Sequence, residues 1–408
     1  MTTDAGTTTD RYAEAAVIAA ADGRGEPGWL RDRRAEAARA FDATPLPTRA
    51  LRPWRYTDVT GLDFGAFAPT AAALSIDASV PDGAYAGTIR DALGAHETLL
   101  RDGLGSLTPA TEGKFQAANA ALWDDGVFVH APARSAFEEP VVAELEVPAG
   151  DAAVFPRVLV VAGEQAEVTV VLRLRSTDAP LLAAGVVEIE AAQAARVRLL
   201  IDDRWGADTQ DYTTVRARLG RDADLQVASL AIGGRVIKQT VEVTLEGEGA
   251  NSAIRAVALG DEDQHFDFVT LQDHTGPRTT SDVEVKAALA GASRSIYYGI
   301  TRVGEDAAGA EANQQNRNLL LSNSSKADSD PVLEILTADV IRCGHGATVG
   351  PVDEEALFYL QSRGLDRRTS LQLLVSGFFQ TVLRDIRLEG VAEELEETVF
   401  AKLARAEL

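Results

Sequence analysis

One cysteine and one histidine stand two positions apart in the stretch IRCGHGATVG, residues 341–350. Cys343 is the only cysteine of the 408 residues, and His345 is one of five histidines. If the stretch is a strand, the two side chains point to the same face, with their Cα atoms roughly 6.5–7 Å apart. A thiolate and an imidazole at that separation can bind one iron ion or one edge of an iron–sulfur cluster.

Two ligands are too few for a closed metal site, so the remaining ligands must come from a second chain or from exogenous thiols. Ile341 alternates with Cys343 and His345 and is expected on their face, while Gly344 and Gly346 permit a bulge or the close approach of a partner. The alternative is that Cys343 is a buried hydrophobic residue and His345 a hydrogen-bonded core residue. Spacing alone favours this alternative, because lone cysteines are among the most buried residues.

No standard catalytic signature accompanies the pair. The sequence has no phosphate-binding loop, no nucleophile elbow, no His-Glu-x-x-His and no Gly-x-Gly-x-x-Gly that opens a helix. The chain is therefore expected to be non-catalytic and to bind no nucleotide. Among the other histidines, His265 and His274 each lie near an aspartate, which is more typical of hydrogen bonding than of a site. His96 and His130 are isolated in the sequence.

The charge is strongly acidic, with 62 Asp and Glu against 39 Lys and Arg, which gives a net charge of −23. Because the acidic residues spread along the whole chain and lysine is scarce, the composition favours a halophilic protein over one local acidic binding surface. A chain of this charge without a basic run repels nucleic acid. It has neither an apolar span of ~20 residues nor a signal peptide, so we expect a cytoplasmic protein with no membrane contact.

The hydrophobic pattern divides the chain into four parts. Residues 1–10 are expected to be a disordered tail, 11–125 an N-terminal helical domain, 126–352 a β core and 353–408 a C-terminal helical domain. Helical patterns in the N-terminal part cover residues 11–22, 28–42, 88–102 and 114–123, with a proline-rich segment at 45–59 between them.

A weak repeat runs through the β region. The segments AEVTVVL, ARVRLLI, ADLQVASL and ANSAIRAVAL begin at Ala166, Ala195, Ala223 and Ala250, which are 29, 28 and 27 residues apart. A near-constant period in strand-rich sequence indicates the stacked coils of a β-solenoid. Regular turn signals also fit a β-sandwich, so the pattern alone leaves both architectures open.

The C-terminal part contains three helical patterns. Asp353 is expected to cap the first helix, Gly364 to end it, and the second helix begins after Asp366. The second helix carries a broad apolar stripe from Leu371 to Ile386. Such a stripe indicates packing against the β core or a face for another protein.

Four segments together resemble the SufB/SufD family of iron–sulfur cluster assembly proteins. ADVIRCGHGATVGPVDEEALFYLQSRGLDRRTSLQLLVSGFF, residues 338–379, is similar to the C-terminal signature of that family. LPTRALRPWRYTDV (46–59), KFQAANAALWDDGVFVHAP (114–132) and QNRNLLLS (315–322) are similar to other segments of it. The form Cys-x-His-Gly-Ala-Thr-Val-Gly resembles the SufD subunit, because SufB usually has glutamates at the positions of Gly344 and Gly346.

The resemblance implies a right-handed parallel β-helix, a β-solenoid, between two helical domains. It implies a scaffold subunit of a SufBCD complex, in which a SufB-like subunit and the ATPase SufC are the partners and SufC holds the ATPase activity. A transient iron–sulfur cluster or iron would form at the SufB interface beside Cys343 and His345, and the resemblance leaves open whether reduced flavin binds. The ATPase would dock on the C-terminal domain, at six apolar residues: Leu371, Leu374, Val375, Phe378, Phe379 and Val382.

Three alternatives stay open at the level of the sequence. The chain could be a SufB-like paralogue that acts as the main cluster scaffold. It could instead be a purely architectural homodimer that recruits SufC and supplies no ligand. A sugar-cleaving β-solenoid enzyme would need a cleft with two paired carboxylates, and the acidic residues are too numerous to single out such a pair.

Overall fold

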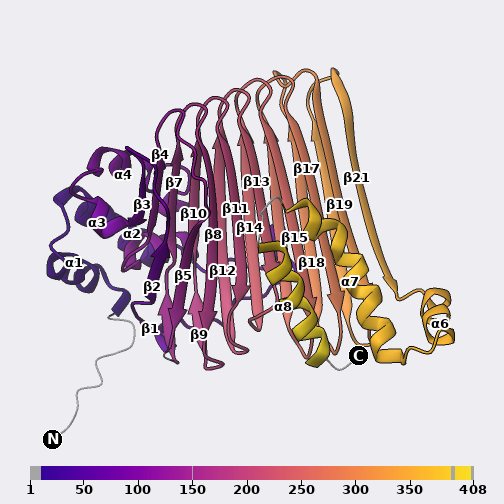
Figure 1. Cartoon of the computed structure of the whole chain (residues 1–408). Helices are drawn as coiled ribbons and strands as arrows, with labels where there is room; N and C mark the ends of the chain where they lie inside the picture. The colour runs from indigo at the N-terminus through magenta and orange to yellow at the C-terminus, as the bar shows by residue number, and fades with distance from the viewer. Residues whose placement is uncertain (1–10, 149, 387–390, 406–408) are drawn as a thin grey trace, which may run out of the picture.

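The body of the protein is a β-solenoid with helices at both ends of the chain (Figure 1). The computed structural model describes residues 11–148, 150–386 and 391–405, so the expected disordered tail, 1–10, lies outside the described residues. The mainly β fold and the solenoid architecture are confirmed, and the sandwich is excluded. No helix in the described part of the chain is long and apolar enough to cross a membrane.

The coils of the solenoid are stacked into two sheets with parallel strand pairing. Among the described residues, sheet A has twelve strands and sheet B has nine. The strands of sheet B run in the order β2-β5-β8-β11-β13-β15-β17-β19-β21, where β2 is Ala73–Asp77 of the N-terminal region. The solenoid strands are β4 (Val127–Ala131), β5 (Val141–Val147), β6 (Ala152–Val154), β7 (Arg157–Ala162), β8 (Glu167–Ser176), β9 (Leu181–Ala183), β10 (Val186–Ala191), β11 (Arg196–Arg204), β12 (Thr209–Leu219), β13 (Asp224–Ala231), β14 (Val236–Leu245), β15 (Asn251–Gly260), β16 (His265–His274), β17 (Thr280–Leu289), β18 (Arg294–Val303), β19 (Ala310–Leu320), β20 (Lys326–Ile335) and β21 (Val340–Pro351).

The weak sequence repeat corresponds to one coil. Its four alanines each precede a strand of sheet B, and all four are buried in the core. The strands that follow pair in matching register, so equivalent residues of the repeat stack directly on one another. The residue before each alanine has a positive φ, between 54° and 72°, at Gln165, Ala194, Asp222 and Gly249. Each coil therefore turns through one left-handed residue at the same place.

The interior of the solenoid changes character along its length. In the early coils the inward side chains are aliphatic, as in β7 and β10, and each fully buried valine or leucine contributes about 1.5–3 kcal/mol. In the late coils apolar residues such as Val283 and Val285 remain, and polar side chains also face each other. The Tyr297 hydroxyl donates to Gln314 at 3.0 Å, and Gln314 donates to the carbonyl of Val332 at 3.0 Å. These polar groups satisfy one another because none can reach bulk water.

The N-terminal region closes the first coil. Its helices are α1 (Glu14–Gly23), α2 (Gly28–Ala43), α3 (Ile89–Ala92), α4 (Glu97–Gly103) and α5 (Lys114–Leu122), and it also contains the short strands β1 (Ala68–Pro69), β2 (Ala73–Asp77) and β3 (Tyr85–Thr88). Strand β2 pairs antiparallel with β5, and β3 pairs antiparallel with β4. The pattern at 88–102 forms two helices rather than one. The two antiparallel strands cover the first edge of each sheet, so that end does not expose a long row of unpaired backbone groups.

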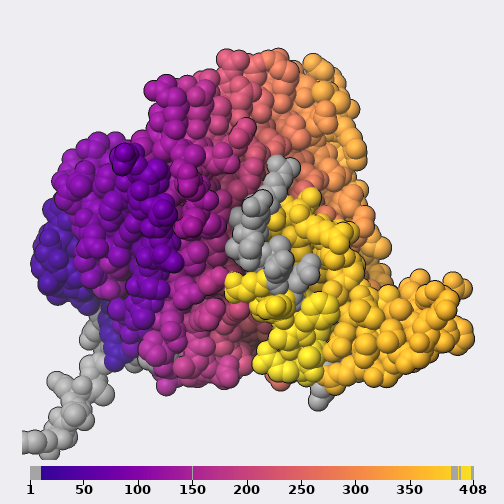
Figure 2. All heavy atoms as spheres, in the orientation of Figure 1, coloured from indigo at the N-terminus to yellow at the C-terminus, as the bar shows by residue number. Residues whose placement is uncertain are grey.

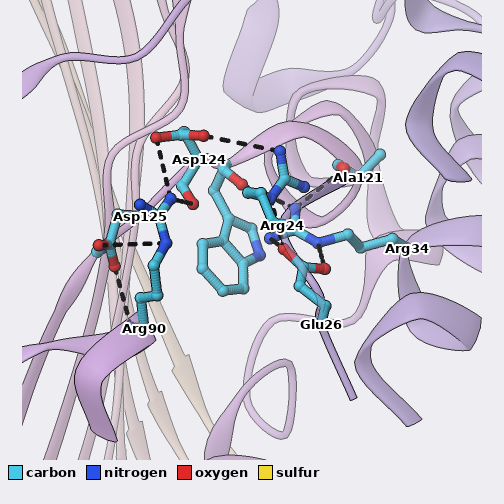
Figure 3. Close-up of polar contacts among 9 residues, drawn as sticks. Arg24, Glu26, Arg34, Arg90, Ala121, Asp124 and Asp125 are labelled. Carbon is cyan, nitrogen blue, oxygen red and sulfur yellow. Dashed lines mark hydrogen bonds and ion pairs between the residues drawn. The ribbon is translucent and has the colours of Figure 1, made fainter. Parts of the chain in front are cut away.

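A buried arginine joins α2 to the end of α5, just before the solenoid begins (Figure 3). The fully buried Arg34 donates to both carboxylate oxygens of Glu26, at 2.6 and 2.8 Å, and to the carbonyls of Ala121 and Trp123. Its guanidinium lies 4.0 Å from the centre of the Trp123 ring. A planar group with five donors is suited to joining this many acceptors in one place.

Helices α7 (Arg367–Asp385) and α8 (Val391–Arg405) cover the outer face of sheet B (Figures 1 and 2). Helix α6 (Glu354–Ser362) precedes them in the chain. Asp353 and Asp366 cap α6 and α7 as predicted, and Gly364 has a φ of 92° directly after α6. On the same face Lys286 donates to the carbonyl of Phe378 at 2.7 Å, and Lys402 donates to acceptors of the coils beneath α8.

Stacking of the turns predicts that Gly247→Ala destabilises the protein. A Cβ atom at residue 247 would overlap the backbone of Gly220 and Arg221 in the preceding coil. We expect a loss of about 1–3 kcal/mol in the free energy of unfolding, measured by urea denaturation. Gly61→Ala is the control, because a Cβ at Gly61 has open space around it. Equal stability of the Gly247→Ala variant and the wild type would contradict the tight contact between turns.

Candidate functional site

Cys343 and His345 lie on β21, at the open end of the solenoid (Figure 1). Within the described residues, β21 is the last strand of sheet B and pairs only with β19. Strand β20 is likewise the last strand of sheet A and pairs only with β18. The C-terminal end of the solenoid therefore presents two edge strands, whereas the N-terminal end is covered.

The pairing register places Cys343 and His345 on the same face of β21. They stand opposite Ala312 and Gln314, two buried residues that point into the solenoid. Cys343 is half-buried and contacts the hydrophobic cluster of the last turn, whereas His345 is exposed at the rim. Cys343 therefore fits the expectation of a buried thiol in part, whereas His345 is exposed and is not the core residue that the alternative expected.

Ile341 does not share this arrangement, which corrects the expectation that it alternates with the other two. The register between β19 and β21 shifts after Ala310, which pairs with Val340, so that Glu311 pairs with Arg342 and Ile341 is the extra residue. The Ile341 side chain is 67% exposed, while Val340 and Cys343 pack inward. The physical reason is that a bulge adds one residue to one strand and interrupts the alternation of side chains.

The two edge strands differ in how they would receive another strand. A Cβ atom placed on Gly344, Gly346 or Gly350 of β21 would meet no atom within 4 Å, so the chain's own fold does not require glycine there. Strand β20 instead carries a central proline and several acidic residues: Asp328, Asp330, Pro331 and Glu334. Charges and proline obstruct strand addition, so β21 is the more accessible edge.

The site is incomplete as a metal centre. In residues 11–148, 150–386 and 391–405, no three His, Cys, Asp or Glu side chains form a group that could hold a metal ion. Cys343 and His345 supply two donors of suitable types on one face. Further donors would have to come from outside this chain.

The six residues expected at the ATPase interface form mostly intramolecular contacts. Leu371, Val375, Phe379 and Val382 are buried, and the last three pack against the outer face of sheet B. Leu374 and Phe378 are half-buried. Their spacing predicted an apolar stripe and left open whether it packs on the β core or meets a partner, and in the structure most of the stripe packs on the solenoid.

The exposed apolar side chains of this region lie mainly on α6, which projects from the body (Figures 1 and 2). Phe358 is 72% exposed and Tyr359 57% exposed, and Leu373 of α7 is also exposed. Sequence reasoning did not single out these aromatic residues. A signal was available in the sequence, because adjacent residues of a helix point in different directions. Two neighbouring aromatic residues on a short helix therefore cannot both pack on the same core.

The 46–59 segment lies across the outer face of sheet A. Thr57 bonds to His265 at 2.8 Å and donates to Asp267, and Asp267 accepts from Lys238 at 2.7 Å. Burial lowers the pKa of His265 to about 4. This segment of the family signature therefore serves to attach the N-terminal region to the solenoid.

The remaining histidines also have structural surroundings. His274 bonds to Thr279 and Ser281, each at 2.8 Å, and burial lowers its pKa to about 4. His96 and His130, which are isolated in the sequence, have ring centres only 5.8 Å apart in the fold. Pairing of β3 with β4 and the start of α4 bring them together, and no sequence pattern could indicate this.

The burial of Cys343 predicts slow alkylation at neutral pH. Burial raises the pKa of the thiol, and the thiolate is the reactive form. We expect iodoacetamide to react more slowly with the folded chain at pH 7 than with the chain unfolded in guanidinium, and the difference to shrink at high pH. Because Cys343 is the only cysteine, one adduct by mass spectrometry reports the rate. Faster reaction of the folded chain would contradict the enclosed thiol.

Comparison with known proteins identifies the family. Residues 146–378, more than half of the chain, match the family model described as SUF system FeS cluster assembly, SufBD core domain. The iron-sulfur cluster assembly SufBD family protein of Staphylococcus epidermidis and the iron-sulfur cluster assembly protein SufB of Bacillus subtilis are each 29% identical over 307 residues. These alignments cover 74% of this chain and 65% of each relative, so the chain matches somewhat less than two thirds of their length. This chain belongs to the SufBD family of iron–sulfur cluster assembly proteins.

Proposed function

We propose that this chain is a SufD-like scaffold subunit of an ATP-driven assembly complex, in which an iron–sulfur cluster forms at the junction with a SufB-like subunit. The observation that carries the proposal is the position of Cys343 and His345 on the accessible edge strand of the solenoid. The Cys-Gly-His form of the motif supports a SufD-like role over a SufB-like one.

Strand addition at β21 is the proposed mode of subunit contact. An edge strand offers a row of free backbone donors and acceptors, which an incoming strand can satisfy. The three glycines of β21 leave room for that strand to approach closely. A SufB-like subunit is the proposed occupant of this edge in the complex, and a second copy of this chain is the proposed occupant in isolation.

The substrate of this junction is iron or a nascent cluster. His345 would offer a neutral imidazole nitrogen, and Cys343 would lose its proton when it binds the metal. Because burial raises the pKa of the Cys343 thiol, this chain holds the thiol in its protonated form until a metal or a partner group displaces the proton. The partner subunit would complete the set of ligands. No residue of this chain is assigned to reduced flavin.

The ATPase SufC is proposed to dock on α6 and the exposed side of α7. Exposed aromatic residues are typical centres of protein interfaces, and Phe358 and Tyr359 are both exposed on α6, a helix that stands away from the body. The buried stripe of α7 then has a different task, since it fixes the docking helices to the solenoid. Movement of the ATPase could in this way be transmitted to the coils.

Substitution of the paired residues tests the cluster role. In the complex with the SufB-like subunit and the ATPase, we expect His345→Ala to reduce cluster formation at least about tenfold, since loss of one donor weakens metal binding. Visible absorbance and bound iron are the measurements. Thr348→Ala, an exposed position on the same strand, is the control. Unchanged iron content in a Cys343→Ser, His345→Ala double variant would favour the purely architectural homodimer.

Substitution on α6 tests the docking surface separately. We expect Phe358→Ser to weaken binding of the ATPase by about 2 kcal/mol or more, roughly 30-fold in Kd, because it removes a central aromatic contact. Phe400→Ser is the matched control, since Phe400 is an exposed aromatic residue of α8. Titration calorimetry gives both affinities. Equal binding by the Phe358→Ser variant and the wild type would exclude this face.

A further inference from the structure

Two carboxyl groups are enclosed within the solenoid, away from the open end. Asp203 is on β11 and Asp211 on β12, and both side chains are fully buried. Ile201, two residues before Asp203, and Val215, four residues after Asp211, belong to the core inside the solenoid. Because side chains alternate along a strand, both aspartates face the same interior. The two strands belong to different sheets, so the carboxyl groups approach each other across the interior.

The hydrogen bonds around the pair come from uncharged groups. The Thr213 hydroxyl donates to Oδ1 of Asp211 at 2.8 Å, and the Gln239 amide donates to Oδ2 of Asp203 at 3.5 Å. Trp205 lies beside the pair, with its backbone N–H towards Asp203 and its indole N–H towards Asp211. The two carboxyl groups lie within hydrogen-bonding reach of each other. Two carboxylates accept and do not donate, so a direct hydrogen bond between the two groups requires a proton on one of them.

We propose that Asp203 and Asp211 share a proton, and that this pair is a proton-binding site through which pH controls the stability of the solenoid. The hydroxyl of the protonated carboxyl donates to an oxygen of the other carboxyl. Two like charges at this separation in a buried site cannot both ionise without a large free-energy cost.

Among the described residues around the pair, no cation lies inside the solenoid to neutralise the two carboxyl groups. The nearest charged neighbour on β11, Asp202, faces the outer side of sheet B, where it pairs with Arg204 at 2.6 Å. Arg204 also pairs with Glu394 of α8, at 3.0 Å. On β14, Lys238 points to the outer face of sheet A and pairs with Asp267. The adjacent residues of β9 and β13 that face the pair are uncharged.

The sign of the pH dependence follows from the burial. Burial raises the pKa of Asp211 to about 7, and burial together with Asp211 raises the pKa of Asp203 well above its ordinary value. Between about pH 4 and pH 7 the folded chain therefore retains protons that the unfolded chain has released. Stability from these retained protons is complete below pH 4 and is lost as the pH rises through the folded pKa values.

The test compares Asp211→Asn with the wild type, because asparagine keeps the shape of the aspartate side chain and removes the titration of residue 211. We expect the unfolding constant of the wild type, relative to that of the variant, to rise by up to about tenfold for each pH unit between pH 4 and pH 7. Urea denaturation at several pH values gives this ratio. Asp306→Asn, an exposed aspartate of a turn between coils, is the control, and its ratio should stay constant.

Infrared spectroscopy provides a second readout that does not depend on unfolding. At pH 6 the folded wild type should show the carbonyl band of a protonated, buried carboxyl, and Asp211→Asn should lose intensity there. Asp203→Asn serves in its place if Asp211→Asn does not fold. A constant stability ratio across pH, or an unchanged protonated-carboxyl band in either folded variant, would overturn the proposal.

Discussion

Backbone pairing between successive coils is the interaction on which the rest of this structure depends. The backbone N–H and C=O groups of each internal strand hydrogen-bond to the strands on both sides. The strands at the two ends of the stack are the ones with a neighbour on one side alone. The N-terminal region closes the first end with antiparallel strands β2 and β3. At the other end β20 and β21 remain as edges. The residues suited to iron chemistry, Cys343 and His345, lie on the edge that is least obstructed.

The outer faces of the two sheets impose a second constraint, because both carry apolar side chains that must be covered. The N-terminal helices and the 46–59 segment cover sheet A, while α7 and α8 cover sheet B. This explains why Val375 and Phe379 are buried, although an amphipathic helix could equally have presented them to a partner. In the described part of the chain, the aromatic residues Phe358 and Tyr359 of α6 have no such cover.

Local signals in the sequence were sufficient for part of this architecture. The spacing from Ala166 to Ala250 matched the length of one coil but left a β-sandwich open, and the family resemblance decided for the solenoid. Asp353 and Asp366 predicted the helix starts, because a capping residue acts within one turn. The bulge at Ile341 was not predictable, since it depends on the register with β19. The contacts between Asp203 and Asp211 and between His96 and His130 were also not predictable, because the stacking of strands decides which side chains meet.

Hydrogen–deuterium exchange of β21 tests the central claim most directly. The amides of residues 342–350 are measured in dilute protein alone and after addition of a SufB-like subunit, with β11, an internal strand of the same sheet, as reference. Strand addition predicts slow exchange in β21 only when the partner is bound, with no change in β11. Formation of the complex without protection of β21 would contradict the account, because the edge that carries Cys343 and His345 would then not be the junction.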